Sequence, residues 1–320
     1  MRDAIGRFLE GTGLPAGDLH DLPSSEKRFP DGAHYRIEIP STEGPRCLEA
    51  VLEHAAHLHV PIHRVSQGSG VLLQTDRELD EMADLAASSS VEVSLFARPN
   101  AGWDTSAMAL SAAGRVISPS ARGADQLVDN LMDVSRAADH GFRSVLLADI
   151  GVLRVFGQLR SAGLFPPTMQ AKVSVMLAAA NPATARLLQD LGANTLNLPT
   201  DLDLAQIAAI RKAVDLPLDV YVEAPGELGG FIRLSRVADI IRVAAPVYVK
   251  LGLRNAPDIY PSGLHLESTA IQLSRERVRR ARIALEIIER SGCQFVTSEI
   301  GASDLAIPIV TRDGTVGPSP

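Results

Sequence analysis

The stretch Leu218-Asp219-Val220-Tyr221-Val222-Glu223-Ala224-Pro225 decides the fold that this sequence predicts. Apolar and polar residues alternate along it with the period of two that is typical of a β-strand. One face of this strand carries Leu218, Val220 and Val222. The opposite face carries Asp219, Tyr221 and Glu223. The strand therefore has one aliphatic face and one face that can bear chemistry.

The same alternation recurs in several stretches that are separated by segments of helical period. Strands that alternate with helices are typical of a parallel sheet, and in a closed barrel the apolar face packs on the helices while the polar face points inward. We therefore predict a single α/β domain with a (β/α)8 TIM-like barrel, and the alternative is an open doubly wound sheet. No G-x-G-x-x-G motif follows the first strand, which disfavours a dinucleotide-binding form of that alternative. The predicted strands are 34–39, 60–65, 91–97, 144–148, 171–176, 195–198, 218–223 and 247–251.

Two segments flank the predicted barrel, which spans residues 32–291. Residues 1–31 form an N-terminal preface in which Arg2 to Glu10 can make a short amphipathic helix before a loop rich in glycine, proline and serine. Residues 292–320 form a C-terminal tail.

The composition restricts the class of protein. The 320 residues are 46% hydrophobic and carry a net charge of −7 without a lysine-rich run, which argues against a nucleic-acid partner. Cys47 and Cys293 are the only cysteines, too few for a disulfide framework or a four-cysteine iron–sulfur site. No apolar run approaches the ~20 residues that a membrane span needs. We expect a cytoplasmic protein without a membrane partner, which can form a homo-oligomer.

The active site of a TIM barrel lies at the carboxyl ends of its strands. Residues predicted to point inward near those ends are Glu38, Arg98, Asn197, Glu223 and Lys250, with Asp149 just beyond its strand. Residues predicted to point inward at a deeper level are Arg36, Glu92, Lys172, Asp219, Tyr221 and Tyr248. Opposite charges are roughly balanced in this set, as burial requires. The set predicts either a functional site or an ion-pair network that fills the barrel.

Three stretches resemble the collagenase-like peptidase family U32. Val145 to Leu153 resembles the strand and D-x-G-V-L segment of that family. Met169 to Lys172, followed by 181–185 and 191–193, resembles its next β-α unit. Asp219 to Glu223 stands where the family has E-x-F-x-H-G. The resemblance covers roughly residues 33–290, and it implies a TIM-like barrel and, by the family's name, peptidase activity.

The sequence departs from that family at two places. The segment 224–231 contains no cysteine where the family continues into a cysteine-rich segment, so we expect no iron–sulfur cluster. Glu223 replaces the family's histidine.

Two kinds of chemistry suit the inward residues, and a third does not. Glu223 and Asp149, with Glu38 as a further candidate, could hold Mg²⁺ or Mn²⁺, which prefer oxygen ligands. Lys250 or Lys172 could instead form a Schiff base, because a desolvated lysine beside another cation can be neutral and nucleophilic. A serine or cysteine nucleophile is disfavoured, because no G-x-S-x-G motif is present.

A long loop from Gly252 to Ser268 follows the last predicted strand. Its position at the catalytic face predicts that it closes over the pocket. Predicted substrate contacts, in this loop and at the strand ends, are Glu38, Arg98, Asn197, Arg254, Asn255, Tyr260 and His265.

These observations predict a U32-like barrel that performs metal-assisted hydrolysis or lysis of a small anionic compound or a peptide. The alternatives are a Schiff-base lyase of the class I aldolase type and a non-catalytic barrel that binds a metabolite. The predicted catalytic residues are Glu223, Lys250, Lys172, Asp219 and Tyr221. For a Glu223 that serves catalysis, we expect Glu223→Gln to abolish turnover and to leave the melting temperature nearly unchanged.

Overall fold

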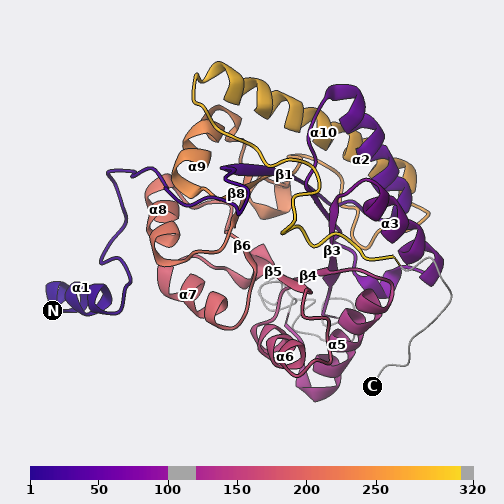
Figure 1. The fold of residues 1–320 in the computed structure, drawn as a ribbon, viewed down its shortest axis with the longest axis horizontal. Coiled ribbons are helices and arrows are strands. Elements are labelled where there is room, and N and C mark those ends of the chain that lie inside the picture. The colour runs from indigo at the N-terminus through magenta and orange to yellow at the C-terminus, as the bar shows by residue number, and fades with distance from the viewer. Residues whose placement is uncertain (100–119, 311–320) are drawn as a thin grey trace.

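The computed structural model describes residues 1–99 and 120–310, and its centre is a closed barrel of parallel strands in the order β1 to β8 (Figure 1). Each strand pairs with the next, and β8 pairs with β1. The strands are β1 (Tyr35–Pro40), β2 (Arg64–Ser66), β3 (Glu92–Ala97), β4 (Ser144–Leu147), β5 (Gln170–Val173), β6 (Thr195–Asn197), β7 (Leu218–Glu223) and β8 (Val247–Leu251). The predicted (β/α)8 barrel is confirmed, and the open sheet is excluded.

Two strands differ from their predicted bounds by three residues or more at one end, for local reasons. The second strand begins at Arg64 rather than at residue 60, and Pro61 has no amide hydrogen to donate to a neighbouring strand. The fifth ends at Val173 rather than at residue 176, because Ser174 caps the 3-10 helix η4 (Val175–Leu177).

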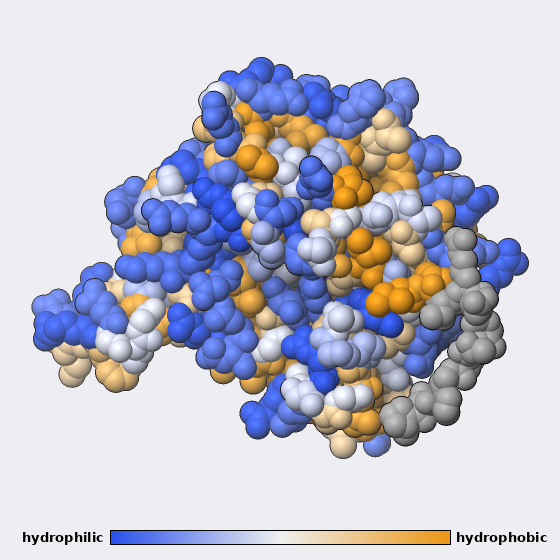
Figure 2. All heavy atoms as spheres, in the orientation of Figure 1, coloured by the Kyte–Doolittle hydropathy of each residue, from blue (hydrophilic) through white to orange (hydrophobic). Residues whose placement is uncertain are grey.

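Helices surround the barrel and cover the outer face of the sheet (Figure 1). They are α2 (Pro45–Leu58), α3 (Asp76–Ser88), α5 (Gly123–Asp139), α6 (Ile150–Ser161), α7 (Pro182–Asp190), α8 (Leu204–Ala213), α9 (Val237–Ala244) and α10 (Glu267–Arg290). The helix α1 (Arg2–Gly11) stands apart from the barrel and has no buried residue (Figures 1 and 2). Short 3-10 helices are η1 (Val71–Leu73), η5 (Gly226–Leu228) and η6 (Leu234–Arg236). In the described parts of the chain, no helix is long and apolar enough to cross a membrane.

Side-chain caps fix where several of these helices begin. Thr75 and Glu78 form the capping box at the start of α3 that their spacing predicts. Asp203 forms a second box at α8, and Asn181 caps α7 with Pro182 in the first turn. These contacts satisfy amide hydrogens that have no partner within the helix.

The aliphatic core lies between the strands and the helices. Ile37, Val93, Val220 and Val249, each from a different strand, are at most 3% exposed and belong to one continuous cluster of buried side chains. Burial of each such side chain contributes about 1.5–3 kcal/mol. The polar alternate residues of the same strands are thereby left to the barrel interior.

The C-terminal tail crosses the amino-terminal end of the barrel (Figure 1). Thr297 forms a parallel bridge with Tyr35, and the Ile309 amide donates to the Gly141 carbonyl over 2.9 Å. Gly141 has a φ of 87°, and a Cβ there would lie 2.4 Å from the Ile309 carbonyl oxygen. The tail thus closes the amino-terminal end of the barrel. This end lies opposite the carboxyl ends of the strands, where a site is expected.

Candidate functional site

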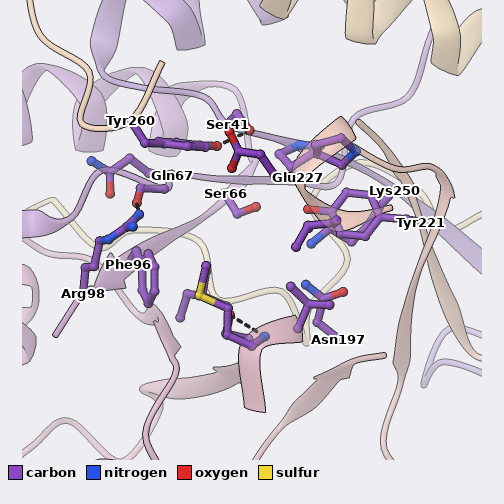
Figure 3. A pocket seen from close by; sticks show the side chains of 18 of the residues that line it. Ser41, Ser66, Gln67, Phe96, Arg98, Asn197, Tyr221, Glu227, Lys250 and Tyr260 are labelled. Carbon is purple, nitrogen blue, oxygen red and sulfur yellow. Dashed lines mark hydrogen bonds between the residues drawn. The ribbon is translucent and has the colours of Figure 1, made fainter. Parts of the chain in front are cut away.

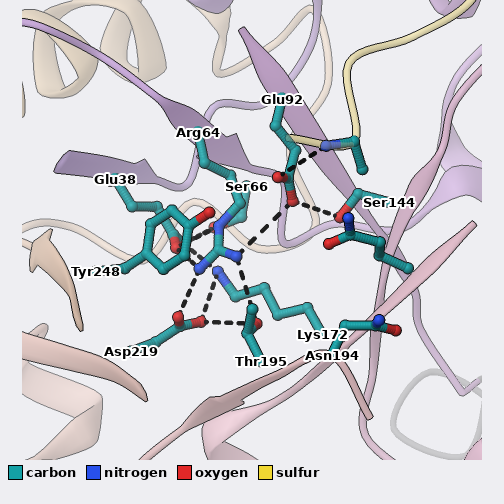
Figure 4. Close-up of polar contacts among 12 residues, drawn as sticks. Glu38, Arg64, Ser66, Glu92, Ser144, Lys172, Asn194, Thr195, Asp219 and Tyr248 are labelled. Carbon is teal, nitrogen blue, oxygen red and sulfur yellow. Dashed lines mark hydrogen bonds and ion pairs between the residues drawn. The ribbon is translucent and has the colours of Figure 1, made fainter. Parts of the chain in front are cut away.

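A network of buried charges fills the barrel interior (Figure 4). Arg64, on β2, donates to Glu38 Oε2 from Nε over 2.8 Å and from Nη2 over 2.5 Å. The same Nη2 lies 2.6 Å from Asp219 Oδ1 on β7. None of these three side chains is exposed to solvent. One guanidinium therefore joins two carboxylates from strands that do not neighbour each other.

Both predicted lysines join the same network. Lys172 Nζ pairs with Glu38 Oε1 and lies 3.3 Å from Asp219 Oδ2. Lys250 Nζ lies 3.2 Å from the same Glu38 Oε1, and Ser66 Oγ donates to that oxygen over 2.7 Å. A single carboxylate oxygen thus serves three donors.

Burial and the neighbouring charges shift the pKa values of Glu38 and Lys172. Burial by itself raises the pKa of Glu38, but Arg64, Lys172 and Lys250 outweigh it and hold that pKa well below the usual range. Burial, together with Arg64, lowers the pKa of Lys172 to about 7, against the opposing pull of Glu38. Glu38 is therefore a permanent anion at neutral pH, whereas Lys172 is close to losing its proton.

A second layer lies below this network, toward the tail. Arg36 donates to both carboxylate oxygens of Asp304 over 3.0 and 2.6 Å, and also to the Tyr248 hydroxyl over 3.1 Å. The ring of Tyr248 lies under Arg64, 3.5 Å from its guanidinium carbon. Glu92 accepts from Ser144 Oγ over 2.8 Å. This layer lies between the charged network and the C-terminal tail.

A cavity of about 400 Å³ opens above the network, at the carboxyl ends of the strands (Figure 3). Its lining residues come from every strand or from the segment that follows it. They are Pro40, Ser41, Ser66, Gln67, Gly68, Phe96, Arg98, Leu146, Ser174, Val175, Met176, Asn197, Tyr221, Pro225, Glu227, Leu228, Lys250, Asp258 and Tyr260. A volume of this size suits a small molecule.

Three predicted site residues lie together at this cavity. Lys250 is 2% exposed, and its Nζ lies 4.4 Å from the centre of the Tyr221 ring. Burial raises the pKa of Tyr221, so its hydroxyl keeps its proton at neutral pH. Asn197 is 2% exposed, and its Oδ1 has no hydrogen-bond partner in the described residues. A buried acceptor without a partner favours a ligand that donates a hydrogen bond.

The loop after β8 forms one wall of the cavity. Tyr260 hydrogen-bonds through its hydroxyl to Ser41 Oγ, and the Ser262 amide donates to Ser69 Oγ over 2.8 Å. A Cβ at Gly68 would lie 2.4 Å from the Tyr260 ring, so glycine is required for this contact. These contacts place the loop at the cavity wall, and its closure over the pocket stays a prediction.

Glu223 does not point into the barrel, which corrects the orientation predicted from strand parity. The pairing of β7 with β8 shifts register after Tyr221, so that Tyr221 pairs with the inward Lys250 but Glu223 pairs with Leu251, whose side chain lies in the outer aliphatic core. The Glu223 carboxylate accepts from the Arg254 amide over 3.1 Å and lies 3.2 Å from Arg280 Nε on α10. It is absent from the cavity lining.

The two carboxylates predicted to hold a divalent metal have separate structural partners. Asp149 caps α6 by accepting from the Val152 amide over 2.9 Å, and it also accepts from the Ala121 amide over 3.0 Å. Glu223 is held by Arg254 and Arg280, as described above. Within residues 1–99 and 120–310, no three His, Cys, Asp or Glu side chains are grouped so that they could hold a metal ion. These residues therefore do not fit the predicted metal site.

The other predicted residues divide into three groups: in the cavity lining, below the cavity floor, and exposed outside the lining. Arg98 lines the cavity and donates to the Gly68 carbonyl over 2.9 Å, while Glu38, Lys172 and Asp219 lie below the cavity floor in the buried network. The residues that are exposed and lie outside the lining are Arg254, Asn255 and His265.

Sequence reasoning missed Arg64, the centre of the network. The preceding residue, His63, is fully buried and has backbone partners: its Nδ1 accepts from the Ile37 amide and its Nε2 donates to the Ser298 carbonyl. The available signal was Pro61, which shifts the strand toward 64–66 and leaves Val65 between two polar residues.

Comparison with known proteins supports the resemblance that the sequence suggested. The model of peptidase family U32 matches residues 121–225, which include β4 to β7, and the resemblance is confirmed. A search of curated proteins finds no matching sequence.

Solved structures with a similar chain course share little sequence with this protein. The YdjI aldolase from Escherichia coli K12 is 14% identical over 81% of this chain and 93% of its own, with a TM-score of 0.49. The U32 peptidase Mk0906 is 18% identical over 62% of this chain and 73% of its own, with a TM-score of 0.38. A truncated 3-deoxy-D-arabino-heptulosonate 7-phosphate synthase from Thermotoga maritima is 14% identical over 87% of this chain and 96% of its own, with a TM-score of 0.46.

Proposed function

We propose, from the premise that this chain is a relative of peptidase family U32, that its barrel holds a small carbonyl compound on Lys250 as a Schiff base. The observation that carries this proposal is the position of Lys250. It is the lysine that lines the cavity, while Lys172 lies below the floor. Of the chemistries predicted from the sequence, the lysine-based lyase therefore suits this geometry best.

The surroundings of Lys250 suit an amine that must react. Its carboxylate partner Glu38 is shared with Lys172 and Arg64, so Lys250 is held by a contact of 3.2 Å rather than by a dedicated ion pair. Lys250 also lies over the face of the Tyr221 ring. The amine is thereby placed at the cavity floor, where a carbonyl compound in the cavity can reach it.

The charge of the network is unchanged by this reaction. A protonated lysine and a carbonyl compound give an iminium ion and one water molecule, which takes the carbonyl oxygen and two amine hydrogens. The nitrogen keeps one positive charge, so Glu38 can stabilise the iminium as it stabilises the ammonium. Bond formation itself requires the neutral amine, whose proton passes to solvent and returns to the carbinolamine oxygen as water leaves.

The lining indicates which carbonyl compounds fit. Asn197 offers an acceptor to a hydroxyl or amino group, and the Tyr221 hydroxyl can donate to an oxygen. Apolar contacts come from Phe96, Leu146 and Met176. We expect a compound of a few carbon atoms with polar substituents rather than an extended peptide.

Metal-assisted hydrolysis, the first prediction from the sequence, is not carried forward, because Glu223 and Asp149 do not meet at the cavity. The described lining also contains no histidine to serve a serine nucleophile.

Trapping with borohydride tests the proposal. The protein is incubated with glyoxylate, pyruvate, hydroxypyruvate, dihydroxyacetone and glyceraldehyde 3-phosphate, reduced, and analysed by intact mass and peptide mapping. We expect a single adduct on Lys250, which Lys250→Met abolishes and Lys172→Met retains. The exposed Lys212 serves as a control, because Lys212→Met should leave the adduct unchanged. An adduct on other lysines, or no adduct with any of these compounds, would overturn the proposal.

The alternative of a non-catalytic metabolite-binding barrel gives a different result. A carbonyl compound that raises the melting temperature equally in the wild type and in Lys250→Met, without a trapped adduct, would support binding alone.

A further inference from the structure

Arg98 and Lys250, the cationic side chains of the described lining, lie on opposite sides of the cavity (Figure 3). Lys250 belongs to β8, and Arg98 directly follows β3, which ends at Ala97. These two strands are three steps apart in a closed ring of eight, which is nearly the full width of the barrel. A molecule that contacts Arg98 while it is bound to Lys250 must therefore span the cavity.

The wall of the cavity holds Arg98 in place. Its Nη1 donates to the Gly68 carbonyl over 2.9 Å, and its guanidinium carbon lies 5.6 Å from the centre of the Phe96 ring and 5.9 Å from that of Tyr260. A Cβ at Gly70, where φ is 111°, would lie 3.2 Å from the Arg98 Cβ, so glycine there leaves room for the arginine. A guanidinium that is fixed in this way is a pre-organised donor for the oxygens of an anion.

The electrostatic surroundings of Arg98 differ from those of the interior arginine Arg64. Burial by itself lowers the pKa of Arg64, but Asp219 and Glu38 outweigh it and raise that pKa. Burial also lowers the pKa of Arg98, and there the neighbouring groups do not outweigh it. An anion in the cavity would offset the cost of this partly buried charge.

The acidic residues of the described lining lie farther out than the cations. Glu227 and Asp258 are exposed, whereas Lys250 is buried and Arg98 is half-buried. Water and salt screen charges at an exposed rim more strongly than charges inside a cavity. The cavity therefore favours an anionic ligand although its rim is acidic.

The lining also offers apolar surface to a carbon chain. The apolar side chains that contribute it include Phe96, Leu146, Val175 and Met176. A chain of methylene groups that joins two polar ends would be removed from water against this surface. At the Tyr260 wall, the buried Ser41 accepts a hydrogen bond from the Tyr260 hydroxyl and can donate its own hydrogen to an anion.

We propose, on the basis of the function proposed above, that the cavity binds an open-chain carbonyl compound whose carboxylate or phosphate group is several bonds away from the carbonyl carbon. Lys250 binds the carbonyl carbon, and Arg98 binds the anionic group on the opposite side. A compound in which the carboxylate adjoins the carbonyl, such as pyruvate, is too short to engage both residues.

Borohydride trapping over a range of ligand concentrations tests this inference with matched pairs of compounds. The pairs are 5-oxohexanoate with its methyl ester, and dihydroxyacetone phosphate with dihydroxyacetone. We expect the anionic member to reach half-maximal trapping on Lys250 at a concentration at least about tenfold lower than the neutral member. Arg98→Met should remove this advantage and leave the curves for the neutral members and for pyruvate unchanged.

Two further variants serve as controls. Arg77→Met removes an arginine that is exposed on α3 and lies outside the lining, and it should leave every curve unchanged. Arg98→Lys keeps the positive charge and should retain part of the advantage, which separates the loss of the anion contact from a disturbed wall.

The outcomes separate this inference from the function on which it rests. No adduct on Lys250 with any of these compounds would overturn the proposed function and this inference with it. Adducts on Lys250 with equal half-maximal concentrations in both members of each pair would overturn this inference alone, as would an advantage that persists in Arg98→Met. Weaker trapping of pyruvate in Arg98→Met would contradict the spanning geometry. An advantage confined to one pair would support the inference and identify the anionic group as a carboxylate or as a phosphate.

Discussion

Arg64 on β2 and Glu38 on β1 are register partners in the parallel sheet, and both side chains are fully buried. Two nitrogens of Arg64 donate to one oxygen of Glu38, and the guanidinium reaches on to Asp219. The attraction between these groups offsets the cost of taking their charges out of water only while all three are present. The cavity floor depends on this arrangement, because Lys250 contacts the same Glu38.

Replacement of Arg64 should therefore destabilise the barrel strongly. We expect Arg64→Met to lower the free energy of unfolding by about 3–5 kcal/mol in urea denaturation, because two buried carboxylates lose the guanidinium that joins them and keep their lysine contacts. Arg46→Met removes an arginine from an exposed pair with Glu49 and should cost no more than about 1 kcal/mol. A similar, small loss in both variants would contradict the central role of Arg64.

Lys172 should make stability depend on pH. Its pKa is lowered to about 7 in the folded protein, chiefly by burial, from 10.5 for an ordinary lysine. Between these values the unfolded chain binds a proton that the folded protein does not, so the contribution of Lys172 to stability rises as the pH rises. The free energy of unfolding of the wild type minus that of Lys172→Met should increase from pH 7 to pH 9, by at most about 1.4 kcal/mol per pH unit.

Lys212→Met removes an exposed lysine and serves as the control. The free energy of unfolding of the wild type minus that of Lys212→Met should stay nearly constant from pH 7 to pH 9. A flat or falling curve for Lys172→Met would show that Lys172 keeps its proton in the folded state.

Glu223 should prove structural rather than catalytic. We expect Glu223→Gln to weaken the contact with Arg280, which is 33% exposed, and to cost about 1–2 kcal/mol of stability. Borohydride trapping at Lys250 should be unaffected. Arg280→Gln should cost a similar amount, and the double variant should cost less than the sum of the two. Loss of trapping without loss of stability would restore the catalytic role predicted from the sequence.

Gly68 should control the wall formed by Tyr260. Gly68→Ala places a methyl group against the Tyr260 ring, so we expect the ring to move and amide hydrogen exchange in residues 254–266 to become faster. Gly17→Ala is the control, since no atom lies within 4 Å of a Cβ at that position. Unchanged exchange in the Gly68 variant would show that the loop holds its place without this contact.

The sequence alone determined the fold and the direction of most interior side chains. Periods of two and of 3.6 residues are local properties, and they sufficed to predict eight strands in one ring, to place Lys250 and Asn197 near the carboxyl ends of their strands and to point Tyr221 inward. The capping box of Thr75 and Glu78 could be predicted for the same reason, because all its atoms belong to neighbouring residues.

Tertiary structure decided the rest. Glu223 turns outward because β7 shifts its register against β8, which depends on the partner strand and not on the alternation within β7. Arg64 becomes the centre of the network because its carboxylate partners come from residues 26 and 155 positions away. The shape of the cavity depends on Tyr260, which meets Gly68 from a distant loop. Contacts between residues far apart in the chain leave no periodic pattern, since their geometry exists only after the barrel has closed.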